Sequence, residues 1–170
     1  CVIADRKDLP THERLFIVED SLTTLQELAK LHREKCNIPI IGITGTNGKT
    51  TTKELIATVL SKKYNIIYTQ GNFNNHLGVP LSLLQIKPET EMAVIEMGAN
   101  HPKEIEFLCS IAKPNYGIIT NIGKAHIEGF GNFQGVINTK KELYDYIKDN
   151  DGIIFLNNDN SILNEISSNI

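Results

Sequence analysis

The segment 42–51 contains the residues whose types and spacing are best suited to chemistry. It reads Gly-Ile-Thr-Gly-Thr-Asn-Gly-Lys-Thr-Thr and follows directly on the apolar run Ile-Pro-Ile-Ile. A strand that leads through a glycine-rich turn into a helix is typical of a phosphate-binding loop, because glycines let backbone N–H groups approach phosphate oxygens. Lys49 adds a positive charge, and the hydroxyl of Thr50 can bind a magnesium ion. The predicted phosphate-binding residues are Gly45, Thr46, Asn47, Gly48, Lys49, Thr50 and Thr51.

This loop is a variant of the common nucleotide-binding pattern G-x-x-x-x-G-K-[ST]. Counting back from Gly48 places Ile43, rather than a glycine, at the first position of that pattern. The sequence also lacks an Asn-Lys-x-Asp element of the kind that reads guanine. Both observations disfavour a generic kinase or GTPase. A P-loop phosphotransferase and a nucleotide-dependent regulatory module remain alternatives.

Polar side chains also follow the other predicted strands, at the point where each strand ends. Glu96 ends one apolar strand, an amide-rich segment at 70–78 follows another, and Asn121 and His126 follow a third. Because ligands of open parallel sheets bind beyond the carboxyl ends of the strands, we expect these groups to converge on the phosphate loop. A buried carboxylate needs a partner, so Glu96 caps the next helix, pairs with a lysine or binds magnesium. The nearby loop favours magnesium.

Several of these polar residues have both a structural and a functional interpretation. His126 is either a hydrogen-bonding loop residue or a ligand for metal or phosphate. The amides of Asn72, Asn74 and Asn75 either serve turns or face a ligand. Lys140 lies in a predicted helix, where a lysine is by default a solvated surface residue.

The apolar pattern along the chain predicts strands that alternate with helices. Strands are expected at 39–44, 65–69, 92–97, 116–121 and 152–156, and helices at 22–35, 50–63, 78–86, 102–112, 134–148 and 160–167. Asp20 or Ser21 can cap the first helix. This alternation predicts an α/β fold with a mostly parallel sheet and helices on both faces.

Composition excludes several classes of protein. The 170 residues are 41% hydrophobic and carry a net charge of −3, which predicts a globular chain with no general affinity for nucleic acid or membrane. No apolar run approaches the roughly 20 residues that span a bilayer. The three cysteines show no paired or metal-binding spacing, so we expect reduced thiols in the cytoplasm. Cys109 lies on the apolar face of a predicted helix and is expected in the core.

Five segments of the chain together resemble the Mur ligases, a family of ATP-dependent amide-forming enzymes of peptidoglycan synthesis. They are TGTNGKTT at 44–51, KE at 53–54, GNFNNHLGVP at 71–80, EMGANH at 96–101 and NIGKAHIEGFG at 121–131. Within the family, the resemblance is strongest to the ligase that adds D-alanyl-D-alanine to UDP-N-acetylmuramoyl-tripeptide. It covers nearly the whole chain and implies a P-loop-containing central domain that binds ATP.

The resemblance also implies a reaction and a role for each candidate residue. ATP phosphorylates the terminal carboxylate of the tripeptide, and the amine of D-alanyl-D-alanine then displaces phosphate from this acyl phosphate. The implied catalytic residues are Lys49, His126 and Lys140, and the ligands of two Mg²⁺ ions are Thr50, Glu96, His126 and Lys140. Asn121 is expected at the nucleotide, and the substrate or the γ-phosphate is expected at Asn72, Asn74 and Asn75. Lys140 would be carbamylated, although the family's Ala-Lys-Gly-Glu corresponds here to Thr-Lys-Lys-Glu at 139–142.

The resemblance further implies that the chain is a fragment. Position 1 is Cys rather than Met, and 1–18 is expected to be the tail of a preceding UDP-substrate domain or a lead-in. The central domain would occupy 19–170 and be incomplete at its C-terminal end. We expect a monomeric, cytoplasmic ligase whose flanking domains are missing here, so that this piece alone is inactive. Another Mur ligase and a folylpolyglutamate synthase-like enzyme are the alternatives within the class.

Overall fold

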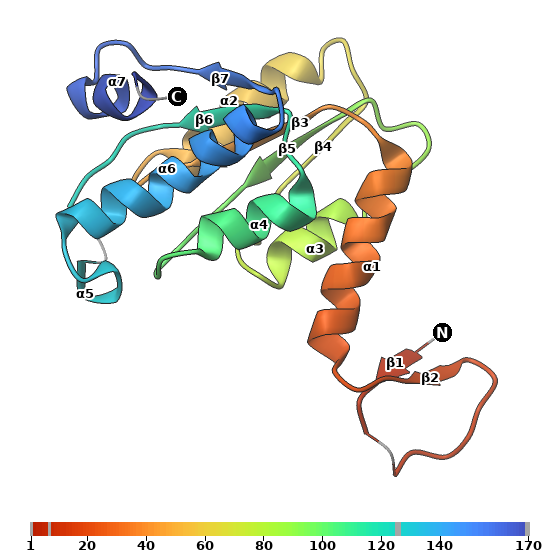
Figure 1. Ribbon diagram of the computed structural model, residues 1–170. Coiled ribbons are helices and arrows are strands. Elements are labelled where there is room, and N and C mark those ends of the chain that lie inside the picture. The colour runs from red at the N-terminus through yellow and green to blue at the C-terminus, as the bar shows by residue number, and fades with distance from the viewer. Residues whose placement is uncertain (1, 7, 125–126, 169–170) are drawn as a thin grey trace.

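The computed structural model describes residues 2–6, 8–124 and 127–168, and its centre is a parallel β-sheet (Figure 1). Within these residues, five strands form the sheet in the order β4-β5-β3-β6-β7. They are β3 (Ile40–Thr44), β4 (Ile66–Tyr68), β5 (Met92–Glu96), β6 (Tyr116–Ile119) and β7 (Ile153–Phe155). Neighbouring strands all run parallel, so every strand ends at the same edge. The predicted parallel sheet is confirmed.

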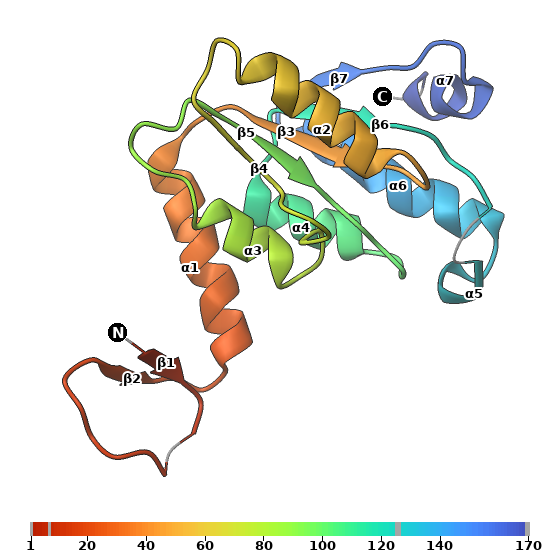
Figure 2. The same ribbon diagram turned by 180° about the vertical axis from the view of Figure 1, so that it is seen from behind.

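Helices cover both faces of this sheet, which confirms the predicted fold class. On one face α2 (Lys49–Leu60) packs over β3, β4 and β5, where a small core contains Ile41, Ile43 and Val94 (Figure 2). The other face carries the larger core. Its helices are α3 (Gly78–Leu83), α4 (Glu104–Ala112) and α6 (Phe133–Asp149), with α1 (Ser21–Cys36) packed against α3 and α4. The last helix, α7 (Ser161–Ser167), adds Leu163 to the larger core, and Cys109 is fully buried there as predicted.

Side-chain caps explain where several helices begin. The carboxylate of Asp20 accepts the backbone N–H of Thr23 at 2.6 Å, so Asp20 rather than Ser21 caps α1. Asn132 and Asn160 cap α6 and α7 in the same way. These caps place the helix starts within a residue or two of the predicted positions.

The observed elements differ from the predicted ones in a few places. A short helix, α5 (Ile127–Phe130), was not predicted, because four residues are too few to show a helical repeat. The predicted strand 116–121 ends at Ile119, since the next residues turn to contact the phosphate loop. The predicted helix 102–112 begins later because Lys103 has a left-handed backbone, with a φ of 71°.

The N-terminal residues form a separate small unit. Here β1 (Val2–Ala4) and β2 (Leu15–Ile17) pair in parallel and lie apart from the sheet, beyond the start of α1 (Figures 1 and 2). The division of the chain into a lead-in at 1–18 and a domain at 19–170 stays a prediction. Among the helices that the structure describes, none has the length and apolar character needed to cross a membrane.

Candidate functional site

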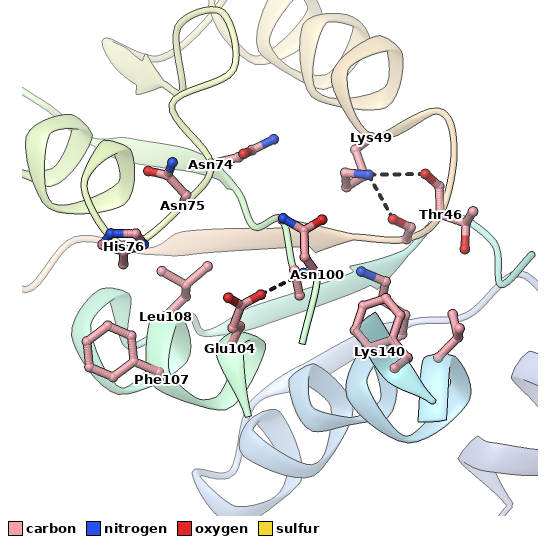
Figure 3. A pocket seen from close by; sticks show the side chains of 15 residues that line it. Thr46, Lys49, Asn74, Asn75, His76, Asn100, Glu104, Phe107, Leu108 and Lys140 are labelled. Atoms are coloured by element: carbon pink, nitrogen blue, oxygen red, sulfur yellow. Dashed lines mark hydrogen bonds between the residues drawn. The ribbon is translucent and has the colours of Figure 1, made fainter. Parts of the chain in front are cut away.

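A pocket of about 310 Å³ opens at the edge where the strands end (Figure 3). The loop after β3 leads to α2 on one face of the sheet, whereas the loop after β5 leads to α4 on the other. Open α/β sheets bind ligands at such a change of direction. The lining comes from the loops after three strands and from α2, α4, α5 and α6, and it includes Gly45, Lys49, Asn74, Asn100, Glu104 and Lys140.

The phosphate loop is held in place by the residues that follow β6. Gly45 has a φ of 143°, and a Cβ there would collide with the side chain of Thr120, so only glycine fits. The Oδ1 of Asn121 accepts the backbone N–H of Asn47 at 3.1 Å, and its Nδ2 donates to the Asn47 carbonyl at 3.1 Å. Thr120 donates to the same carbonyl at 2.6 Å. Asn121 therefore positions the loop, and its predicted contact with the nucleotide stays a prediction.

Lys49 is the first residue of α2, and its ammonium group folds back onto the loop. Its Nζ donates to the carbonyls of Gly45 at 2.8 Å and Thr46 at 3.2 Å (dashed lines in Figure 3). The cap residue Gly48 has no side chain that could occupy the N–H groups at the start of the helix. Burial lowers the pKa of Lys49, and the negative charge of Glu96 opposes this effect. The helix start and the lysine together form a site for an anion.

Glu96 ends β5 with only 1% of its surface exposed, so its carboxylate is a buried charge. Its Oε2 accepts the hydroxyl of Thr50 at 3.0 Å, and its Oε1 accepts the amide of Asn74 at 2.8 Å. Two neutral donors do not neutralise a buried carboxylate, whereas a divalent cation would. The carboxylate, hydroxyl and amide oxygens of these three residues are the ligand types that Mg²⁺ prefers.

The structure therefore brings together Thr50 and Glu96, two of the predicted metal ligands. In the part of the chain that the structure describes, no group of three or more His, Cys, Asp or Glu side chains could hold a metal by itself. A magnesium ion here would also need phosphate and water ligands, as it usually has at nucleotide sites. His126, the predicted ligand of a second ion, lies outside the described residues.

The other predicted residues occupy different positions around the pocket. Asn75 lines it, and its Oδ1 accepts the backbone N–H groups of Leu77 at 3.1 Å and Gly78 at 2.9 Å, at the start of α3. Asn72 is exposed and lies outside the lining. The loop residues that are exposed and do not line the pocket are Asn47, Gly48, Thr50 and Thr51, although the hydroxyl of Thr50 reaches Glu96. The predicted ligand contacts of these residues stay predictions.

Lys140 is buried, so the default interpretation as a solvated surface lysine is wrong. Only 3% of its surface is exposed, and its Nζ lies 5.7 Å from the centre of the Phe130 ring. Figure 3 shows the side chain reaching from α6 into the same pocket as Lys49. Burial, and then the positive charge of Lys49, lower the pKa of Lys140 from 10.5 to about 8. The pocket thus contains two cations from opposite faces of the sheet.

Some residues of the pocket were not predicted. The Oε2 of Glu104 accepts the backbone N–H groups of Asn100 at 2.6 Å and His101 at 3.0 Å, and so holds the loop after β5. Phe107 and Leu108 form an apolar wall on the same helix. In the sequence these residues belong to an amphipathic helix, a pattern that does not distinguish a pocket wall from the core.

Comparison with known proteins gives a consistent result. The family model described as "Mur ligase middle domain" matches residues 43–170. A "UDP-N-acetylmuramoyl-tripeptide--D-alanyl-D-alanine ligase" of Bacillus subtilis is 39% identical over 158 residues, which are 93% of this chain and 35% of that protein. The protein of the same name from Synechocystis is 44% identical over 150 residues, which are 88% of this chain and 33% of that protein.

Solved structures agree with the sequence comparison. A crystal structure of MurF from Acinetobacter baumannii matches 98% of this chain and 36% of that one, with a TM-score of 0.86 and 36% identity. MurF from Thermotoga maritima in complex with ADP matches 98% of this chain and 39% of that one, with a TM-score of 0.84 and 37% identity. The chain spans about a third of the length of the curated relatives it matches.

Proposed function

This chain belongs to the Mur ligase family, and from that membership we propose that it is the ATP-binding part of a peptidoglycan ligase. The proposed reaction joins D-alanyl-D-alanine to UDP-N-acetylmuramoyl-tripeptide at the expense of ATP. The relatives described above have this substrate pair in their names, and one MurF structure is a complex with ADP. We place the enzyme in the cytoplasm as a monomer. Further parts of the ligase, which this chain does not include, would bind the substrates.

The proposed chemistry has two steps. The terminal carboxylate of the tripeptide attacks the γ-phosphorus of ATP, which forms an acyl phosphate and releases ADP. The amine of D-alanyl-D-alanine then attacks the acyl carbon, and the tetrahedral intermediate loses phosphate and a proton to give the amide. Since the first step brings a carboxylate against a triphosphate, positive charge is needed where the two meet.

The residues that line the pocket, together with Thr50 and Glu96 beside it, fit this requirement. Lys49 would leave the loop carbonyls and bind the β- and γ-phosphates, while the N–H groups at the start of α2 bind phosphate oxygens. Thr50 and Glu96 would hold one Mg²⁺ ion, and His126 a second. Bound magnesium would supply positive charge at the phosphates. Asn74 orients the Glu96 carboxylate, and the exposed amide of Asn72 remains available for the substrate.

We also assign Lys140 as the carbamylated lysine. In carbamylation the ammonium group first loses a proton, and the neutral amine then bonds to CO₂ and loses a second proton, which converts a cation into an anionic oxygen ligand. The site suits this change because Lys140 is buried beside a second lysine, where a positive charge is unfavourable. Among the described residues, its Nζ has no hydrogen-bond or ion-pair partner and lies over the Phe130 ring.

The observation that carries the proposal is the hydrogen bond between the buried Glu96 carboxylate and the hydroxyl of Thr50, the residue that directly follows Lys49. Hydroxylamine tests it, because an acyl phosphate reacts with hydroxylamine to give a hydroxamate. With ATP, Mg²⁺ and UDP-N-acetylmuramoyl-tripeptide, the ligase that carries this chain should form a hydroxamate that depends on ATP. Phosphate transfer to a hydroxyl without hydroxamate would instead indicate a phosphotransferase.

A substrate panel separates the alternatives within the class. D-Alanyl-D-alanine should be the preferred amine, and a preference for a single amino acid or for glutamate with a folate would indicate another Mur ligase or a folylpolyglutamate synthase-like enzyme. The isolated chain of 170 residues should bind nucleotide only weakly and should not ligate. Phosphate release by the isolated chain that depends on both substrates would contradict this expectation.

A further inference from the structure

Lys53 is a fully buried lysine that the proposed reaction does not use. It lies on the face of α2 that packs against the sheet, and none of its surface is exposed. Its Nζ donates to the carbonyl of Thr69 at 2.6 Å, at the end of β4. The same nitrogen lies 3.0 Å from a carboxylate oxygen of Glu54 and 5.7 Å from the centre of the Tyr68 ring.

A lysine at this position is costly, which argues that it does more than fill space. The side chain of its ion-pair partner, Glu54, is half exposed, so the partner is a weak compensation for a buried charge. One turn later on the same helix the buried residue is Ala57, an ordinary choice for a helix that faces a sheet. Aliphatic residues that replace buried ion pairs often leave stability unchanged or raise it. Packing alone therefore does not require Lys53.

The partner of Lys53 connects it to the proposed magnesium ligands. Thr69 is fully buried, and its Oγ1 accepts the backbone N–H of Glu96 at 2.9 Å. The Glu96 carboxylate in turn accepts the hydroxyl of Thr50, which lies on α2 one turn before Lys53. The contacts thus form a closed circuit from Thr50 along α2 to Lys53, then through Thr69 to Glu96 and back to Thr50. Each link in this circuit is either one turn of α2 or a hydrogen bond of 3.0 Å or less.

We propose that Lys53 is a positioning residue, which sets the Glu96 carboxylate against the Thr50 hydroxyl by holding Thr69 between α2 and β5. Lys53 does not line the pocket, and it acts through the backbone of Thr69. The inference rests on the proposed function, because it assumes that Thr50 and Glu96 bind the magnesium ion of a nucleotide. Its consequence is a specific effect on magnesium, since groups behind metal ligands change metal affinity by about 10- to 100-fold.

The test uses the ligase that carries this chain. Calorimetry with a non-hydrolysable ATP analogue compares its nucleotide binding with and without magnesium. Lys53→Met keeps an unbranched side chain that reaches as far as the lysine Cε and removes the ammonium group. It should reduce the gain in nucleotide affinity from Mg²⁺ about tenfold, and leave the affinity in EDTA within about twofold of wild type. Lys62→Met, an exposed lysine just after α2, is the matched control and should bind like wild type.

Two substitutions of Thr69 test the same circuit with Lys53 left in place, and remain informative if Lys53→Met does not fold. Thr69→Val removes the acceptor of the Glu96 N–H and should reduce the magnesium effect, whereas Thr69→Ser keeps a hydroxyl and should restore it.

A merely structural role of Lys53 would lower the melting temperature without changing the magnesium effect. Folded Lys53→Met or Thr69→Val with a wild-type response to Mg²⁺ would overturn the inference alone. A wild-type protein that binds no nucleotide would overturn the proposed function itself.

Discussion

Replacing Lys140 with methionine should stabilise the ligand-free protein, because the lysine is a buried cation beside Lys49. A fall in pKa from 10.5 to about 8 corresponds to about 3 kcal/mol, at about 1.4 kcal/mol for each pKa unit. Methionine keeps the unbranched side chain but loses the contact with the Phe130 ring, which is worth about 1 kcal/mol. We expect Lys140→Met to raise the free energy of unfolding by about 2 kcal/mol at pH 7.

The stability that Lys140→Met gains over wild type should depend on pH in a defined direction. Below about pH 8 Lys140 is protonated in both the folded and the unfolded protein, so the cost of burying its charge is fully present. Between pH 8 and 10.5 the folded state loses the proton first, and wild-type stability rises relative to the variant. The advantage of Lys140→Met should therefore shrink as the pH rises through this range.

Urea unfolding from pH 6.5 to 9.5, in EDTA and CO₂-depleted buffer, measures this difference and prevents carbamylation of the wild type. Lys141→Met is the control, because Lys141 is the next residue of α6 but is partly exposed and paired with Asp145. It should change stability by less than about 1 kcal/mol at every pH, as exposed ion pairs do. The reasoning would be refuted if the Lys140→Met protein were less stable than wild type at pH 7. It would also be refuted if the difference in unfolding free energy between the two proteins did not change with pH.

Three further substitutions test other parts of the structure. Glu96→Gln should abolish most of the magnesium-dependent gain in nucleotide affinity, measured by calorimetry, and a wild-type response would contradict the metal assignment. Gly78→Ala should cost about 2 kcal/mol in urea unfolding, because a Cβ there collides with the backbone of Phe73; an unchanged unfolding midpoint would be inconsistent with this packing. Arg33→Met should lower the free energy of unfolding by about 1–3 kcal/mol, since the carbonyl of Ala112 loses its buried donor at 2.9 Å, and equal stability would show that water replaces it.

The sequence predicted the features that depend on short stretches of chain. Alternating apolar segments predicted the parallel sheet, and the order strand, glycine turn and Lys49-Thr50 predicted the phosphate loop at the end of β3. Glu96 was predicted at the same edge because the carboxyl ends of parallel strands always meet. The structure places its carboxylate 3.0 Å from the hydroxyl of Thr50, across 46 residues of sequence.

Other features depended on which elements pack together. Lys140 and Lys53 look like ordinary helix lysines in the sequence, yet both are buried, one facing the pocket and one against the end of β4. The amides of Asn74 and Asn75 are equivalent by composition, but one donates to Glu96 and the other accepts the backbone N–H groups of Leu77 and Gly78. No local pattern distinguishes these roles, because they depend on residues that are distant along the chain.

By itself, then, the sequence determined the fold class, the family and the glycine-rich turn from β3 into α2, since backbone propensities and glycine geometry act over a few neighbouring residues. The tertiary structure alone decided which lysines are buried and which groups hold Glu96. Burial and hydrogen bonding are set by contacts between distant segments, and these contacts give Lys140 its low pKa and join Lys53 to the proposed metal ligands.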